Sequence, residues 1–322
     1  MATISFPSSL DSEAPALSLH HRSPGWYQIV LGVVTIAQMC GAVGFSQNRD
    51  HDSVVSIGSF ENAVAFAVDP DDNVYVLDAA TNELLKLSVN GRILAKVGGY
   101  GWTQDEFDQP KDVIAPNGLD VYVADYGNHR VQHFDRNLNF VSSFSTRDDP
   151  QTETPFGYPK SVALSRSGEL FITDGENKRV LKTGASNDVE GILGDVRAGK
   201  GMLRLPERVR VSESDNVYVQ DGNAIVVFDF FGNYLRDIGE HYFDHLRTFT
   251  LGEQLLVAVD SCTIRKFSLR AEQVLAESDV PQIGELDYCD ILDLAVRDDT
   301  LFVLSRHRVS LILPASLWNI GN

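Results

Sequence analysis

The chain has 322 residues, with 45 acidic and 27 basic side chains and a formal net charge of −18. Hydrophobic residues at 43% and charged residues at 22% are ordinary for a globular protein, which excludes a disordered or collagen-like chain. The strong negative charge argues against a nucleic-acid partner, because such binding depends on Lys and Arg side chains that neutralise phosphates. Three cysteines are too few for a scaffold built on disulfides.

The first part of the chain differs in composition from the rest. Residues 1–25 form a polar leader, and no charged residue occurs between Ser23 and Asn48. Residues 26–46 are mostly apolar from Ile29 to Phe45 and begin with the aromatic pair Trp26 and Tyr27. An apolar stretch of roughly 17–25 residues can cross a bilayer as a helix, and aromatic side chains favour its edges. Residues 26–46 are therefore expected to be a transmembrane anchor or a signal segment.

Two interpretations of residues 26–46 remain open. A cleaved signal peptide has a short basic leader, whereas this leader is long and contains Asp11 and Glu13. An uncleaved anchor fits better. Basic residues that flank an anchor favour the cytoplasmic side, and no cluster of them lies between the apolar segment and the acidic domain. The acidic domain is therefore expected outside the cytoplasm, on the periplasmic side. The alternative is a cleaved, soluble protein that is secreted or periplasmic.

An internal repeat begins near residue 53. Similar β-rich segments end at equivalent positions, spaced by 47, 49, 47, 39 and 45 residues: Asp78, Asp125, Asp174, Asp221, Asp260 and Ser305. Each unit contains four short strand-like runs separated by turn residues, as a propeller blade requires. This period predicts an all-β fold, a six-bladed β-propeller with four-stranded blades and few helices.

The last unit lacks a fourth strand. It ends with RVSLIL at residues 308–313, followed by Pro314 and a tail at 314–322. The segment SVVSIG at residues 53–58 precedes the first unit and resembles the outermost strand of other units. We expect this N-terminal strand to complete the last blade, because closure removes an unpaired strand edge. The propeller then covers residues 53–313.

The segment Val97–Phe144 resembles an NHL repeat, the unit of a family of six-bladed propellers. The resemblance rests on the Gly-rich run before Phe107 and Pro110, the YVAD strand end and the NHRV segment at 128–131. It extends with decreasing strength over roughly residues 53–313. It implies the fold and says little about function, because such folds host unrelated activities.

The repeated aspartates have two interpretations. A ring of acids could bind a metal ion, but an Asp at the end of a strand commonly accepts hydrogen bonds from backbone N–H groups of the turn, two residues on. Arg130 and Arg179 follow Asp125 and Asp174 by five residues, within reach of an ion pair. A structural role is therefore expected for these aspartates, and no metal or other cofactor is expected.

Enzymes among six-bladed propellers provide a different class of function. Calcium-dependent hydrolases and lactonases present several oxygen ligands at the channel mouth. Here the repeats place unlike residues at the equivalent positions, with the fifth unit not placed: Val64, Lys111, Lys160, Glu207 and Ile291. Peptide-amidating lyases hold zinc through histidines, and no three histidines are equivalent among His129, His133, His241, His245 and His307. No catalytic residue is therefore expected.

Exposed aromatic and basic residues indicate a protein partner. Tyr100 and Trp102 lie in the long Gly-rich connection between the first two units, and aromatic residues concentrate binding energy at interfaces. Further candidate contacts are the basic residues Arg204, Arg208 and Arg306. Cys262 and Cys289 lie in connections that emerge on the same face of adjacent blades, so they form either a disulfide or two separate thiols.

These observations predict a membrane-anchored propeller outside the cytoplasm. Its expected role is that of a non-catalytic structural or interaction subunit of an integral-membrane protein complex, for example a photosynthetic or respiratory one. The alternatives are an exported enzyme of lyase or lactonase type and a soluble periplasmic propeller that binds a ligand or peptide.

Overall fold

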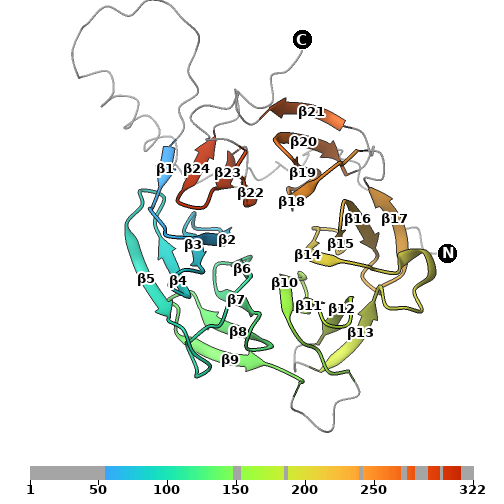
Figure 1. Ribbon diagram of the computed structural model, residues 1–322, viewed down its shortest axis with the longest axis horizontal. Coiled ribbons are helices and arrows are strands. Elements are labelled where there is room, and N and C mark those ends of the chain that lie inside the picture. Colours follow the sequence, from blue (N-terminus) through green and yellow to red (C-terminus); the bar gives the residue numbers. More distant parts are fainter. Residues whose placement is uncertain are drawn as a thin grey trace, which may run out of the picture. The chain divides into compact units, whose positions relative to one another are not determined.

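The protein is described by a computed structural model that covers residues 55–147, 154–184, 188–238, 242–269, 274–279, 289–297 and 300–312. Twenty-four strands form six antiparallel four-stranded sheets arranged as the blades of a ring (Figure 1). In the described ranges the single helical element is the short 3₁₀ turn η1, Gly199–Gly201. The predicted six-bladed, all-β architecture is confirmed.

The first strand of each blade is the innermost, so β2, β6, β10, β14, β18 and β22 lie nearest the centre of the ring (Figure 1). Blades 1 to 3 consist of β2 (Ala63–Val68), β3 (Val74–Asp78), β4 (Glu83–Leu87) and β5 (Ile93–Gly98); β6 (Asp112–Ile114), β7 (Asp120–Asp125), β8 (Arg130–Asp135) and β9 (Phe140–Phe144); β10 (Pro159–Leu164), β11 (Leu170–Asp174), β12 (Arg179–Thr183) and β13 (Val189–Leu193). Blades 4 to 6 consist of β14 (Pro206–Val211), β15 (Val217–Asp221), β16 (Ala224–Phe228) and β17 (Tyr234–Ile238); β18 (Leu246–Leu251), β19 (Leu255–Asp260), β20 (Thr263–Ser268) and β21 (Val274–Asp279); β22 (Asp293–Arg297), β23 (Thr300–Leu304), β24 (Val309–Ile312) and β1 (Val55–Ile57).

The ring closes through the N-terminal strand, as the sequence predicts. Strand β1 pairs antiparallel with β24, with Val55 opposite Leu311 and Ile57 opposite Val309. It thereby supplies the fourth, outermost strand of the last blade (Figure 1). This pairing joins two segments from opposite ends of the propeller sequence and removes an open edge from β24.

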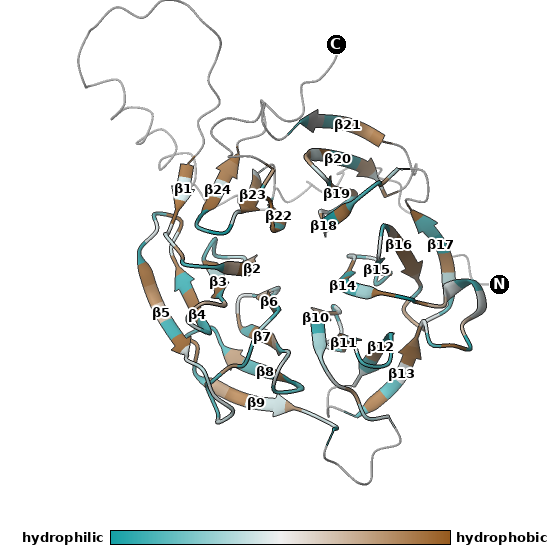
Figure 2. Ribbon diagram, viewed as in Figure 1, coloured by the Kyte–Doolittle hydropathy of each residue, from teal (hydrophilic) through white to brown (hydrophobic). Residues whose placement is uncertain are grey.

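The hydrophobic core lies between blades. Each buried cluster joins apolar side chains from two neighbouring blades; in one of them Ala124 and Val131 of blade 2 pack with Val162 and Ile172 of blade 3. Figure 2 shows hydrophobic residues on the strands of every blade and hydrophilic residues on many of the turns. Since each blade buries both faces against its neighbours, its second strand is almost wholly buried, as in β11.

The expected leader at residues 1–25, the apolar segment at 26–46 and the tail at 314–322 lie outside the described residues. Within the described part of the chain, no helix is both long and apolar enough to span a membrane.

Candidate functional site

One face of the ring collects nearly every residue that the sequence singles out. Neighbouring strands run antiparallel, so the connections between blades and the turns between second and third strands emerge on the same side. We refer to this side as the interblade face. It carries Tyr100 and Trp102 between β5 and β6, Arg204 between β13 and β14, and Arg306 between β23 and β24.

The repeated aspartates are structural, and their main partners differ from the predicted ones. Asp78 does accept a bond from the N–H two residues on, that of Ala80, at 3.0 Å. More generally, these carboxylates accept N–H groups from the preceding interblade connection, 15 to 17 residues earlier. The expected ion pairs Arg130–Asp125 (2.8 Å) and Arg179–Asp174 (2.9 Å) are present, and a third joins Arg265 to Asp260.

The connection that carries Trp102 is held rigidly although its aromatic side chains are exposed. Trp102 is 76% exposed and Tyr100 71%. The Arg130 guanidinium donates to the carbonyl oxygens of Trp102 (3.1 Å), Thr103 (2.8 Å) and Glu106 (2.9 Å). Phe107 of the same connection is fully buried. The two exposed rings are therefore presented by a backbone that the second blade fixes in place.

Replacing Arg130 by Lys is expected to lower the free energy of unfolding by about 1.5–3 kcal/mol, because an ammonium cannot reproduce the divergent bonds of a guanidinium. Urea unfolding measures this loss, and limited proteolysis reports release of residues 99–107. The matched control is Arg136→Lys, since Arg136 pairs with the 58% exposed Asp71 on the surface. An equal effect of both substitutions would contradict the role of Arg130.

A polar cavity of about 430 Å³ opens at the channel mouth. Its lining comes from blades 2 to 5 and consists of Gln109, Lys111, Asp112, Tyr126, Lys160, Ser161, Glu207, Arg208, Gln220 and Arg247. This volume is in the usual range for a small-ligand pocket, but the lining is charged rather than apolar.

Of the residues predicted for the mouth, Lys111, Lys160 and Glu207 line this cavity, whereas Val64 of β2 in blade 1 is not part of its lining, and one assignment needs correction. Lys111 and Leu292 donate equivalent backbone bonds, to the carbonyl oxygens of Ala124 and Leu304. Leu292 is therefore the sixth-blade equivalent of Lys111, and the assignment of Ile291 was wrong by one residue. Ile291 is instead buried in the core between the last two blades. The register also places the fifth unit, whose rim residue Arg247 precedes Thr248, the partner of Val259.

Beyond the rim, polar side chains of several innermost strands form a buried network across the channel. Asp112 of blade 2 accepts bonds from Ser161 of blade 3 (2.5 Å) and from Arg210 of blade 4 (3.0 Å). The Ser161 hydroxyl in turn accepts the Val209 N–H at 3.1 Å. Three blades are thereby joined at their inner strands.

Asp293 of blade 6 has the corresponding role on the other side. Its carboxylate is fully buried and pairs with Arg208 of blade 4, while it accepts the Phe66 N–H of blade 1 at 3.3 Å. The Arg208 side chain is consequently only 12% exposed. Of the three basic residues predicted as partner contacts, Arg204 and Arg306 lie on the surface, whereas the guanidinium of Arg208 is engaged inside the channel.

These pairs perturb the ionisation of the buried groups. Burial alone would raise the pKa of Asp112, but the guanidinium groups of Arg210 and Arg208 and the bonds from Arg210 and Ser161 hold the pKa below its ordinary value. Burial likewise opposes the charge of Arg210, and Asp112 outweighs it, so the pKa of Arg210 is raised. Both groups are therefore charged at neutral pH.

The described residues do not include a group of three or more His, Cys, Asp or Glu that could hold a metal ion. His129 lies 2.7 Å from a guanidinium nitrogen of Arg147, a cation that opposes a second cation there. His133 stacks on Tyr122 and bonds Asp120, and His307 bonds the Phe60 carbonyl. His245 lies before β18, and His241 is outside the described residues. This donor set does not fit a histidine-bound zinc ion.

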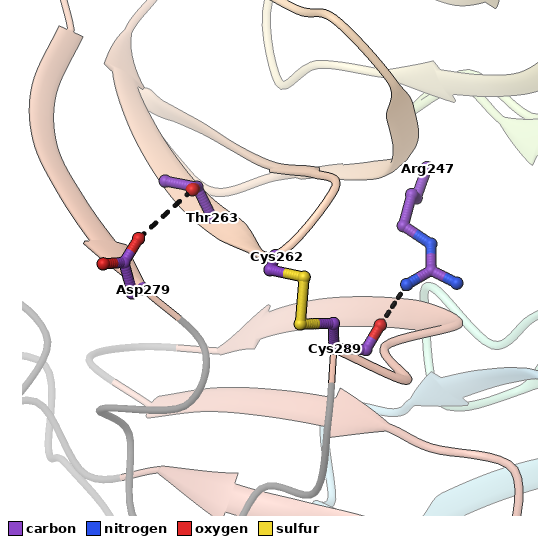
Figure 3. The surroundings of a disulfide bond; sticks show 5 residues. All are labelled: Arg247, Cys262, Thr263, Asp279 and Cys289. Carbon is purple, nitrogen blue, oxygen red and sulfur yellow. Dashed lines mark hydrogen bonds between the residues drawn. A yellow bond between two sulfur atoms is a disulfide. The ribbon is translucent and has the colours of Figure 1, made fainter.

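Cys262 and Cys289 form a disulfide that joins blade 5 to the connection before blade 6 (Figure 3). Their Cα atoms are 4.7 Å apart. The backbone carbonyl of Cys289 accepts a bond from the Arg247 guanidinium at the channel mouth (Figure 3). The disulfide thus lies next to the cavity.

Several site residues were missed at the level of sequence. Asp112, Arg210, Asp293 and Arg247 form the channel network or its rim, and none of them was predicted to lie in the channel. One usable signal existed, because Asp112 follows the recognised rim position Lys111 by one residue, as Asp293 follows Leu292.

Comparisons with known proteins agree with the fold. The sequence profile of the NHL repeat matches residues 107–134. Protein brain tumor of Drosophila melanogaster is 26% identical over 149 residues, 45% of this chain and 14% of that protein. Peptidylglycine alpha-amidating monooxygenase of Rattus norvegicus is 31% identical over 124 residues, 35% of this chain and 13% of that protein. The matches thus span only about a seventh of these relatives.

Solved structures show the same architecture at low identity. A streptogramin B lyase superposes with a TM-score of 0.62 and 12% identity, covering 83% of this chain and all of that one. Virginiamycin B lyase from Staphylococcus aureus gives a TM-score of 0.55 with 11% identity, covering 81% of this chain and 99% of that one. At these identities the likeness concerns the fold alone.

Proposed function

Because the chain is a six-bladed β-propeller that carries an NHL repeat, we propose that it is a non-catalytic interaction subunit that presents its interblade face to a protein partner. The observation that carries this proposal is the connection between β5 and β6. Trp102 and Tyr100 are exposed there, while Arg130 fixes the backbone beneath them. Rigid exposed aromatics are efficient anchors, because little conformational entropy is lost when they bind.

The proposal includes the site of action. Residues 26–46 tether the propeller to a membrane, and the propeller lies outside the cytoplasm, where its partner belongs to an integral-membrane complex, for example a photosynthetic or respiratory one. The Cys262–Cys289 disulfide supports an oxidising compartment. The tether raises the local concentration of the propeller beside its partner, so a modest interface is sufficient.

The second candidate function is an exported enzyme, since relatives and similar folds are named monooxygenase or lyase. The contacts of Glu207 and His129 do not favour it. Glu207 is paired with Lys160 at 2.6 Å, and His129 faces the Arg147 guanidinium. A stoichiometric metal that is lost, together with activity, in Glu207→Gln or His129→Ala would establish the enzyme instead.

The interaction subunit is tested by purifying the full chain in mild detergent from its native membranes. Trp102→Ala combined with Tyr100→Ala is expected to reduce the fraction of chain that migrates in a larger complex, with affinity about 30-fold weaker or more, because a buried aromatic anchor contributes about 2 kcal/mol or more.

The matched control is Phe231→Ala. Phe231 is 84% exposed, but it lies in the turn between β16 and β17, on the opposite face. The complex should persist in this control variant. A chain that is soluble without detergent and monomeric, or a complex equally sensitive to both variants, would refute the proposal.

A further inference from the structure

The channel mouth has a charge opposite to that of the whole chain. The protein carries a net charge of −18, yet its cavity of about 430 Å³ is lined by four cationic side chains and two acidic ones. The cations are Lys111, Lys160, Arg208 and Arg247, and the acids are Asp112 and Glu207. A positive recess in a negative surface concentrates field lines and attracts an anionic group.

The ion pairs of the channel account for two of these four cations. Lys160 forms an ion pair with Glu207 at 2.6 Å, and Arg208 forms one with Asp293. The acidic Asp112 forms its ion pair with Arg210. No carboxylate of the described residues pairs with Lys111 or Arg247. The Lys111 ammonium lies over the ring of Tyr126, 5.4 Å from its centroid, and both residues line the cavity. Among the described residues, these two positive charges on the rim are thus not neutralised by an ion pair.

Arg247 is held in position by the neighbouring disulfide. Its guanidinium donates to the Cys289 carbonyl, and Cys289 is covalently fixed to Cys262 (Figure 3). Cys289 also has a φ of +59°, a left-handed conformation that non-glycine residues adopt at a cost and keep only where the surroundings enforce it. The disulfide provides such a restraint, which orients the guanidinium at the mouth before a ligand arrives.

We propose that the channel mouth is a carboxylate-binding pocket, in which Lys111 and Arg247 bind the carboxylate and the Cys262–Cys289 disulfide positions Arg247. In the Lys160–Glu207 pair, a lysine of this mouth already binds a carboxylate of the chain itself. The guanidinium of Arg247 offers planar paired donors that match a carboxylate, and the Tyr126 ring fixes Lys111 from one side.

This inference rests on the proposed function, because it names the group by which the partner is recognised. The pocket opens on the interblade face, the face that also carries Trp102 and Tyr100. A partner seated on those rings can place an acidic side chain or its C-terminal carboxylate in the mouth. The aromatic anchor then supplies affinity, and the pocket supplies selection for an acidic group.

The test uses the full chain in detergent and saturation-transfer NMR with succinate as the probe. The neutral analogue succinamide and inorganic phosphate are measured in parallel. Wild-type protein is expected to bind succinate in preference to both. Lys111→Gln and Arg247→Gln are each expected to weaken binding roughly tenfold, since each removes a charge-assisted hydrogen bond. The matched control Arg92→Gln, an exposed cation in the turn between β4 and β5 on the opposite face, should leave binding unchanged.

Two blocked peptides distinguish the source of the carboxylate. One carries an internal Glu and an amidated C-terminus, and the other carries a free C-terminus and no acidic side chain. Binding of either peptide, lost in the Lys111→Gln, Arg247→Gln double variant, supports the pocket and identifies the source. Succinate binding that the double variant retains, or equal binding of phosphate or succinamide, overturns it. Persistence of the complex in the Trp102→Ala, Tyr100→Ala variant would contradict only the proposed function, so the two failures are distinguishable.

Discussion

Replacing Asp112 by Asn is expected to lower the free energy of unfolding by about 3–5 kcal/mol, because it leaves the Arg210 guanidinium in the channel without its carboxylate. Asp112 is buried, with 1% of its surface exposed, and it also accepts the Ser161 hydroxyl and the Val162 N–H. An amide oxygen can still accept hydrogen bonds from these groups, but the amide cannot neutralise the cation. The substitution therefore weakens the attachment of blades 3 and 4 to blade 2.

Urea unfolding measures the loss, with Asp71→Asn as the matched control. Asp71 forms an ion pair with Arg136 on the surface, where the expected cost is below about 1 kcal/mol. A further variant, Asp112→Leu with Arg210→Met, removes both charges and is expected to recover much of the loss, since apolar residues can replace a buried ion pair. Equal losses for Asp112→Asn and Asp71→Asn would show that the network contributes little.

The same carboxylate makes stability depend on pH. The pKa of Asp112 is lower in the folded protein than its ordinary value, because Arg210 and Arg208 outweigh the effect of burial. The stabilisation is therefore complete above the unfolded pKa of about 3.9 and is lost as the pH falls through the folded pKa. The difference in unfolding free energy between wild type and Asp112→Asn should be constant at neutral pH and shrink below about pH 4. A difference that stays constant in acid would assign the loss to packing alone.

The sequence predicted the ring because the signals for it are local. Turn residues and alternating strands recur in each unit, and an Asp ends the second strand in five of the six units. The strand at residues 53–58 belongs to no complete unit, and the last blade is the one that lacks a fourth strand. Register within a blade is also local, but a one-residue error in a divergent unit is easy, as Ile291 and Leu292 show.

The network in the channel could not be predicted in the same way. Asp112 and Arg210 are separated by 98 residues, and Arg208 and Asp293 by 85. Which acid meets which base depends on side-chain directions across the ring, and no repeat signal encodes this. Arg208 was consequently predicted to contact a partner at the surface, although its guanidinium group pairs with a buried acid. Arg265 repeats the spacing of Arg130 and Arg179 and could have been found from the sequence.

Removing the Cys262–Cys289 disulfide is expected to lower the free energy of unfolding by about 3–4 kcal/mol. The two cysteines are 27 residues apart in the chain, so the bond closes a loop of that length in the unfolded state and restricts its conformations. The enclosed segment contains β20 and β21, including the outermost strand of blade 5. An outermost strand is bonded to its sheet on one side only, so its attachment depends more on such a restraint than an inner strand does.

The double variant Cys262→Ser, Cys289→Ser measures this effect, in a background where the third cysteine, Cys40, is also replaced by Ser. That background protein, oxidised and then reduced, is the matched control, because reduction opens the bond without changing a side chain. Reduced control and double variant should unfold at the same urea concentration, well below the oxidised control. Because the Cys289 carbonyl positions the Arg247 guanidinium, succinate binding is also expected to be weaker in the reduced control and in the double variant. The Lys160–Glu207 pair should stay intact in both proteins. Equal stability of all three proteins would contradict the stabilising role of the disulfide, because closing the loop should restrict the unfolded chain only in the oxidised control.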